Sequence, residues 1–166
     1  MEAIQNYSRR DFVKTIGLAS GGLLLAANSS LFASESSTTI ETFNPNLFVY
    51  LQTDGTLTLI ASRSEMGNGV RTSLPSIIAD EMEADWTKVV VQQALGDAKY
   101  GDQNTDGSRS ILYLYETMRK MGATAKALLI TAAAQKWNVP EAECIAQHHF
   151  IVHNSGKKLG FGELAA

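Results

Sequence analysis

Two glycine-containing segments hold the residues best suited to contact a ligand. The first is Gly67-Asn68-Gly69, which directly precedes an amphipathic stretch that begins at Val70. Glycine permits positive φ and a close backbone approach to a ligand, and the free N–H groups of a helix N-terminus attract anions and oxo groups. The neutral amide of Asn68 can donate a hydrogen bond there without adding charge. The alternative is a tight turn in which Asn68 only caps the helix.

The second segment is Thr105-Asp106-Gly107-Ser108-Arg109-Ser110, at the start of a long amphipathic stretch. Its three hydroxyl side chains flank a glycine, and such hydroxyls can cap the helix or bind a phosphate. The arginine can add a charge-assisted bond to a pyrophosphate, whereas the aspartate would repel one. These residues alone leave two interpretations open, a plain capped helix and a phosphate-binding helix start.

Other charged side chains are expected to stabilise the fold. Glu65 precedes the glycine turn, and a single carboxylate there usually caps a helix or pairs with a cation. Asp80 and Glu81 are expected on a solvated helix face. The outer face of the long helix is marked by four cations, Arg119, Lys120, Lys126 and Lys136.

The cysteine and the histidines do not have the spacing of a catalytic or metal site. Cys144, the only cysteine, is expected to be a small buried residue in a short helix. His148, His149 and His153 are expected on an exposed polar strand, because no cysteine or carboxylate lies at metal-ligand spacing nearby. A hydrolase is not supported either, since the sequence contains no Gly-x-Ser-x-Gly motif.

The composition is that of a globular chain without a nucleic-acid-binding surface. Hydrophobic residues make up 45% and charged residues 19% of the 166 positions, which argues against a disordered chain. The formal charge is −3, and no basic block follows residue 20. The clustered cations that bind nucleic acid are therefore missing from the sequence.

The N-terminus has the pattern of an export signal. Ser8-Arg9-Arg10-Asp11-Phe12-Val13-Lys14 is followed by an apolar stretch over 16–27 that is too short to span a bilayer. We predict a twin-arginine signal peptide over residues 1–33, a linker over 34–43 and a periplasmic mature chain. An ordinary Sec signal and an uncleaved anchor are the alternatives. The twin-arginine translocase carries folded proteins, so this signal peptide favours a protein that binds a cofactor.

Residues 44–166 alternate strand and helix patterns, which predicts an α+β fold. Asp54-Gly55 is a hairpin signal between two strand patterns. We expect a small mixed sheet with one long helix packed on it, and Gly122 and Ala125 of that helix allow a second backbone to approach closely. The expected strands cover 47–51, 57–61, 88–94, 150–153 and 158–159, and the expected helices cover 70–84, a stretch from 108–110 to 137, and a short segment after Pro140.

The C-terminal residues 161–166 have the pattern of a helix that the chain does not complete. Because a domain rarely ends at the first turn of a helix, we expect an incomplete part of a larger domain. In such a fragment, the face of the long helix that carries Gly122 and Ala125 would be exposed and would favour association. A non-catalytic exported domain, left by truncation as a binding or structural module, is the alternative.

Several motifs, in order, resemble the xanthine dehydrogenase and aldehyde oxidase superfamily. Glu65-Met66-Gly67-Asn68-Gly69 is similar to its Glu-Met-Gly-Gln-Gly motif, and Thr105–Ser110 is similar to its Thr-x-x-Ser-x-Ser loop before a long helix. The resemblance covers Asn44 to the end and is strongest to the large (beta) subunit of isoquinoline 1-oxidoreductase-like enzymes. Further matching segments are Lys136-Trp137-Asn138-Val139-Pro140, Glu143-Cys144 and Gly160-Phe161-Gly162-Glu163-Leu164.

This resemblance implies the N-terminal segment of a molybdenum-binding domain. The family binds molybdopterin cytosine dinucleotide, oxidises aldehydes or N-heteroaromatics with water as the oxygen source, and passes electrons to an iron–sulfur small subunit. The cofactor-binding residues implied here are Gly67, Asn68, Gly69, Thr105, Gly107, Ser108 and Ser110. The family's catalytic glutamate lies near the C-terminus of a much longer large subunit. This chain would therefore need the remainder of that subunit for activity.

Overall fold

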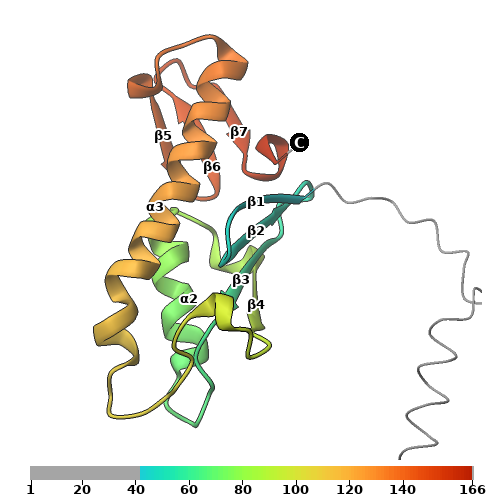
Figure 1. The fold of residues 1–166 in the computed structure, drawn as a ribbon. Coiled ribbons are helices and arrows are strands. Elements are labelled where there is room, and N and C mark those ends of the chain that lie inside the picture. The colour runs from blue at the N-terminus through green and yellow to red at the C-terminus, as the bar shows by residue number, and fades with distance from the viewer. Residues whose placement is uncertain (1–41, 166) are drawn as a thin grey trace, which may run out of the picture. The chain divides into compact units, whose positions relative to one another are not determined.

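The computed structural model describes residues 42–165, which form an α+β fold, as the sequence predicted (Figure 1). The expected signal peptide over 1–33 and most of the expected linker lie outside the described residues. Within the described part, a four-stranded sheet and a three-stranded sheet accompany two α-helices. Neither helix of this part combines the length and apolar character needed to cross a bilayer.

The four-stranded sheet is mixed and has the order β1-β2-β3-β4. Its strands are β1 (Thr42–Asn46), β2 (Val49–Gln52), β3 (Leu57–Ala61) and β4 (Val89–Gln93). The first three are antiparallel neighbours, whereas β3 and β4 are parallel. The connection between β3 and β4 contains the helix α2 (Val70–Glu81), as a parallel crossover requires.

The hairpin predicted at Asp54-Gly55 is confirmed between β2 and β3. Gly55 has φ of 89° and donates its N–H to the carbonyl of Gln52, and the Asp54 side chain accepts from the N–H of Thr56. The edge strand β1 was not predicted, since its residues were assigned in part to the linker. Pro45 weakens its strand pattern, but an edge strand tolerates proline because one side of its backbone needs no partner strand.

The second helix, α3 (Ser110–Trp137), packs along α2 and reaches the second sheet (Figure 1). The prediction that Gly122 allows close backbone approach is confirmed, because a Cβ at this position would lie 2.7 Å from the carbonyl oxygen of Ile78. Gly122 and Ala125 are both buried. The expectation that this face would be exposed is therefore wrong, since α2 covers it.

The three-stranded sheet is antiparallel, with the order β5 (Cys144–Gln147), β6 (Phe150–His153) and β7 (Lys158–Gly160). Cys144 is buried as expected, but it begins β5 and does not lie in a helix. The short helix expected after Pro140 is a single 3-10 turn over Glu141–Glu143 and ends before the cysteine. The expected final helix is likewise one 3-10 turn, Gly162–Leu164.

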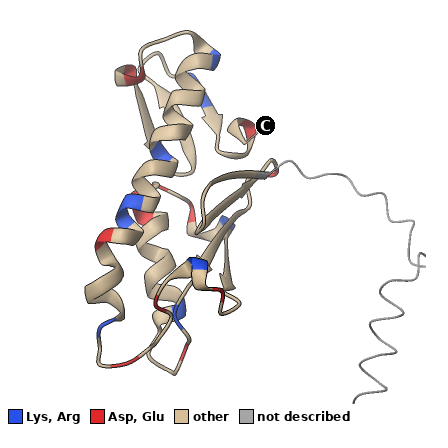
Figure 2. Ribbon diagram, in the orientation of Figure 1, with Lys and Arg blue, Asp and Glu red and all other residues tan. Residues whose placement is uncertain are grey.

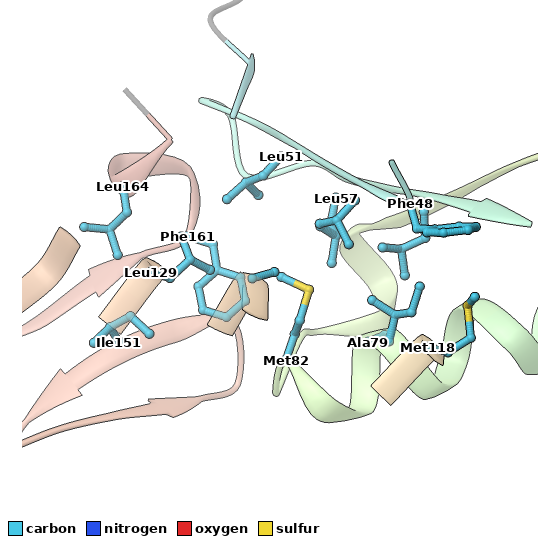
Figure 3. Packing of buried hydrophobic residues seen from close by; sticks show 14 of the residues in the cluster. Phe48, Leu51, Leu57, Ala79, Met82, Met118, Leu129, Ile151, Phe161 and Leu164 are labelled. Atoms are coloured by element: carbon cyan, nitrogen blue, oxygen red, sulfur yellow. The ribbon is translucent and has the colours of Figure 1, made fainter. Parts of the chain in front are cut away.

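The two sheets and both α-helices share one hydrophobic core (Figure 3). Leu51 and Leu57 come from the first sheet, Leu129 from α3, Ile151 from β6 and Phe161 from the C-terminal segment, and all are almost completely buried. Because burial of such side chains is the main favourable contribution to folding, this cluster fixes α3 against both sheets.

His149 corrects the expectation of an exposed histidine strand. His148 and His149 form the turn between β5 and β6, with φ of 47° and 70°. His148 is exposed, but only 1% of His149 is accessible to solvent. The His149 ring packs on Phe161, with the ring centroids 4.4 Å apart. Contacts with distant segments bury this side chain, and they leave no trace in the local pattern.

Charged residues of both signs lie along α3 (Figure 2), and two of them correct the expected solvated face of α2. Glu81 accepts from Arg119 Nε at 3.0 Å and from Lys126 Nζ at 3.3 Å, and its side chain is only 20% exposed. Arg119 and Lys126 therefore bind α2 instead of marking an outer face. Asp80 is exposed, as expected.

Candidate functional site

The two predicted ligand-binding segments meet at one open cleft of about 390 Å³. Five of the seven predicted residues line it, namely Asn68, Thr105, Gly107, Ser108 and Ser110. Gly67 and Gly69 lie beside it and are not part of its lining. A hydrogen bond of 2.7 Å from Thr105 Oγ1 to the carbonyl of Ser64 joins the two segments. The fold thus brings together residues that lie about forty positions apart in the sequence.

The N-terminus of α2 is satisfied from within the chain. The two carboxylate oxygens of Glu65 accept from the N–H groups of Gly69 and Arg71, at 3.0 and 3.1 Å. These bonds, that of Arg71 first, lower the pKa of Glu65 and confirm it as a capping residue. The positive end of this helix is already occupied by an internal anion.

Positive backbone φ explains why glycines flank Asn68. Gly67 has φ of 85° and Gly69 has φ of 76°. A Cβ at either position would have no other described residue within 4 Å, so the requirement is conformational and not one of space. Asn68 is exposed at the edge of the cleft, and its Oδ1 accepts from the N–H of Val70 at 3.4 Å. Its amide N–H groups bind no residue of the described part and remain available to a ligand.

The N-terminus of α3, in contrast, is open. Its N-cap residue, Arg109, makes no side-chain cap bond, and the backbone N–H groups of Ser110, Ile111 and Leu112 have no acceptor among residues 42–165. Ser110 is only 7% exposed and lines the cleft, yet its hydroxyl makes no hydrogen bond within the described chain. The hydroxyl oxygen is not fully buried, since Arg63 Nε is the one buried side-chain N or O atom without a partner in the described chain, so it can bond to a ligand or to water in the open cleft.

Two ion pairs lie at or near this end of the cleft. Asp106 lines the cleft and binds the Arg109 guanidinium. The hydrogen bond from Arg109 lowers the pKa of Asp106 below its usual value. In the second pair, Arg63 is 2% exposed and donates from Nη2 to Asp102 at 3.2 Å, while its Nε has no partner within the described residues.

Arg63 was not identified from the sequence as a site residue. The available signal was its position, two residues after a strand pattern that ends at Ala61 and four residues before Gly67. A charge at the end of a buried strand needs a partner. The partner, Asp102, is 39 residues away in the sequence and could not be named from spacing.

These donors fit a phosphate-bearing group and do not fit a metal ion. The cleft offers the free N–H groups of the first turn of α3, the Ser110 hydroxyl and the Asn68 amide, which together attract negative charge. Residues 42–165 contain no cluster of three His, Cys, Asp or Glu side chains that could hold a metal ion directly. A metal bound here would need to be carried by a group with its own ligands.

Relatives of this chain are much longer than the chain itself. The Brevundimonas diminuta isoquinoline 1-oxidoreductase subunit beta is 32% identical to it over 96% of this chain and 22% of that protein. The membrane-bound aldehyde dehydrogenase [pyrroloquinoline-quinone] of Gluconacetobacter polyoxogenes is 34% identical over 75% of this chain and 16% of that protein. The chain therefore spans less than a quarter of the length of these curated relatives.

Solved structures share the fold. Quinoline 2-oxidoreductase from Pseudomonas putida 86 superimposes with a TM-score of 0.59 and 17% identity over 70% of this chain and 15% of that one. For the CO dehydrogenase of Oligotropha carboxidovorans the TM-score is 0.58 with 19% identity, over 70% of this chain and 15% of that one.

The family model of the molybdopterin cofactor-binding domain matches residues 6–166, nearly the whole chain. The match and the relatives agree with the superfamily that the two cleft-lining motifs indicated. The chain thus belongs to the molybdopterin cofactor-binding domain family of xanthine dehydrogenase-type large subunits, and it corresponds to part of a molybdenum hydroxylase large subunit.

Proposed function

We propose that this chain forms a cofactor-facing part of an exported molybdenum hydroxylase, and that its cleft binds a phosphate of molybdopterin cytosine dinucleotide. The observation that carries the proposal is the Ser110 hydroxyl, which has no hydrogen-bond partner in the described chain and belongs to a residue that lines the cleft, next to the free N–H groups of α3. A phosphate oxygen would accept from both, because a helix N-terminus favours negative charge.

Each wall of the cleft has its own part in this proposal. Ser110 and the first turn of α3 hold the phosphate, and the Thr105 hydroxyl keeps the loop of α3 against Ser64. Asn68 faces the same space from the other wall, where its neutral amide donates to an oxo or phosphate oxygen. Gly67 and Gly69 give the turn that presents Asn68, since both have positive φ.

The proposed reaction is that of the isoquinoline 1-oxidoreductase-like branch. When bound, the molybdenum cofactor would supply the oxidative hydroxylation of an aldehyde or N-heteroaromatic carbon, with water as the oxygen source. The described residues supply binding and orientation, and a base glutamate is not assigned among them. We therefore propose that activity requires the remainder of the large subunit and an iron–sulfur small subunit, and that this chain alone is inactive.

Export by the twin-arginine pathway, with a periplasmic mature protein, is part of the same proposal. It is supported by the run from Ser8 to Lys14 and the short apolar stretch that follows. Replacing Arg9 and Arg10 by lysines should retain the protein in the cytoplasm, as measured by fractionation and immunoblotting. Unchanged export of this variant, together with loss of export when the Sec translocase is inhibited, would indicate an ordinary Sec signal instead.

The cofactor assignment is tested on the complex purified through a tag on this chain from molybdate-grown cells. We expect molybdenum and acid-released cytidine nucleotide in the complex, and lower contents of both in Ser110→Ala. Ser155→Ala is the matched control, since Ser155 lies in the turn between β6 and β7, where its hydroxyl bonds to His153, and neither residue lines the cleft. A tagged chain that purifies folded, without partners, molybdenum or nucleotide would favour a non-catalytic exported module.

A further inference from the structure

The side chain of Arg109 bends back to Asp106 on its own loop and also lies over the ring of Tyr113, 5.6 Å from the ring centroid, and it is not part of the cleft lining. Its guanidinium binds Asp106, three residues earlier. Gly107 makes room for this arrangement, because a Cβ at position 107 would lie 3.1 Å from Arg109 Nε. Asp106 lines the cleft, whereas Arg109 is not among its lining residues. The cation best suited to bind a phosphate is thus held by the one carboxylate that lines the cleft.

We propose that Asp106 is a built-in competitor for Arg109: it withholds the guanidinium in the ligand-free cleft, and an incoming pyrophosphate group takes Arg109 over. This inference rests on the proposed phosphate-binding function of the cleft. It concerns the regulation of that site by the chain's own residues.

Asp106 does not act as a helix cap, so little free energy is lost when it releases Arg109. Its side chain bonds only to Arg109, and to no backbone N–H group of the described chain. Glu65 shows the contrast, because both its oxygens are used by the N-terminus of α2. Releasing Asp106 would therefore leave the first turn of α3 unchanged and its N–H groups open.

The Asp106–Arg109 pair is weak enough to exchange. The two side chains are 56% and 44% exposed, and ion pairs at this exposure contribute little in water. A monovalent anion offers Arg109 no more charge than Asp106 already provides. Pyrophosphate carries several negative charges and can contact Arg109 and the α3 N–H groups together, so it gains more than the carboxylate loses.

Arg63 gives the released carboxylate a second cation nearby. The charge of Arg63 contributes, after the hydrogen bond and charge of Arg109, to the lowered pKa of Asp106. Arg63 is held in place by burial and by Asp102, and its Nε has no acceptor in the described part of the chain. A cation therefore remains near Asp106 after Arg109 has left it.

The test measures binding of inorganic pyrophosphate to the purified full chain by calorimetry. Asp106→Asn should lower the dissociation constant for pyrophosphate roughly two- to fivefold, the range expected for loss of an exposed competing charge. Asp80→Asn is the matched control, since it removes the same charge from an exposed position of α2. Asp80 lies between two and three helical turns after Val70, the first residue of α2, which lines the cleft. This control should leave the dissociation constant within error of the wild type. Asp106→Ser serves as a second variant if the asparagine variant does not fold.

Exchange of the guanidinium is read directly from the Nε–H resonance of Arg109 in ¹⁵N NMR, assigned with Arg109→Lys. We expect the resonance to move on addition of pyrophosphate, and to stay in place with nitrate at the same ionic strength. If pyrophosphate binds but the resonance does not move, or Asp106→Asn binds no more tightly, the competitor proposal is wrong and phosphate binding stands. If nitrate moves the resonance equally, salt screening explains it and the competitor proposal is again wrong. If no pyrophosphate binds to any variant, both proposals fail.

Discussion

The Nε2 atom of His149 lies 2.9 Å from the carbonyl oxygen of Gly55, which is 94 residues away in the sequence. The Nδ1 atom of the same ring accepts from the N–H of Asp85 at 3.3 Å. Because Asp85 N–H can only donate, Nδ1 must be unprotonated, and Nε2–H donates to Gly55. The neutral ring thus connects the β2–β3 turn, the loop after α2 and the β5–β6 turn.

This arrangement predicts a loss of stability in mild acid. Burial, the largest cause, lowers the pKa of His149 in the folded state below its usual value of 6.5. The unfolded chain therefore takes up a proton first as the pH falls. The histidine's contribution is fully present above the unfolded-state pKa and decreases as the pH falls from about 6.5 towards the folded-state pKa. Urea unfolding at pH 7.5 and 5.5 measures this decrease.

The variant His149→Asn isolates this contribution. Asparagine tolerates the positive φ of this turn, but it cannot titrate, so part of the pH dependence should disappear. The free energy of unfolding should fall by about 1–3 kcal/mol at neutral pH, because buried backbone groups lose their partners. His148→Asn is the matched control in the same turn, and its exposed ring should contribute little. Equal effects of the two variants would contradict the assigned role of His149.

Close packing of α2 and α3 gives a second prediction. Gly122→Ala should lower the free energy of unfolding by about 1–3 kcal/mol, because the new Cβ would lie 2.7 Å from the carbonyl oxygen of Ile78. In an unobstructed helix the same change would stabilise by about 1 kcal/mol. Urea unfolding gives the sign of the change in the free energy of unfolding, and a decrease would confirm the close packing at Gly122. A more stable variant would mean that the helices separate at no cost.

The ion pairs of Glu81 give a third prediction. Glu81→Gln should lower the free energy of unfolding by about 1 kcal/mol at low salt, and by less at 1 M salt, because Arg119 and Lys126 lose their shared partner. The hydrogen bond from Arg119, its largest cause, lowers the pKa of Glu81. The contribution should therefore also be lost as the pH falls through that lowered pKa. Glu141→Gln, at an exposed position in the turn before β5, is the control and should have little effect.

Local patterns predicted the parts of the fold that depend on neighbouring residues. The Asp54-Gly55 turn, β4 and the long helix α3 each follow from turn chemistry or hydrophobic period. The burial of His149 and the pairing of Glu81 with Arg119 could not be predicted in this way. These contacts span 94 and 38 residues, and only the packed structure brings the partners together.

In the candidate site, too, local patterns predicted some features and long-range contacts determine the others. Residue types and spacing identified the segments around Asn68 and Thr105–Ser110, and the pairing of Asp106 with Arg109 agrees with their i,i+3 spacing. Sequence could not show that both segments line one cleft, because their contacts, including the bond between Thr105 and Ser64, join residues about forty positions apart. It also could not show that Glu65 satisfies α2 while the first turn of α3 stays open.

The glycine turn beside Asn68 gives a fourth prediction. Gly69→Ala should be less stable than Gly69→Asn, because position 69 has φ of 76° and asparagine adopts this region more readily than alanine. No described residue would lie within 4 Å of the new Cβ, so the difference cannot arise from a clash. Thermal unfolding of the two variants makes the comparison. Equal melting temperatures would show that the turn adapts, and that glycine is not required for its conformation.

The hydrogen bond between the two cleft walls gives the last prediction. Thr105→Val keeps the shape of the side chain but removes the donor to the Ser64 carbonyl. The wall formed by Asn68 should then be held less firmly against the α3 loop, and pyrophosphate should bind about two- to tenfold more weakly, the equivalent of one hydrogen bond. Thr124→Val is a close control, because the Thr124 hydroxyl donates to the Lys120 carbonyl within α3, away from the cleft. If both variants bind pyrophosphate as the wild type does, the walls are positioned by packing alone, and the 2.7 Å bond has no part in forming the site.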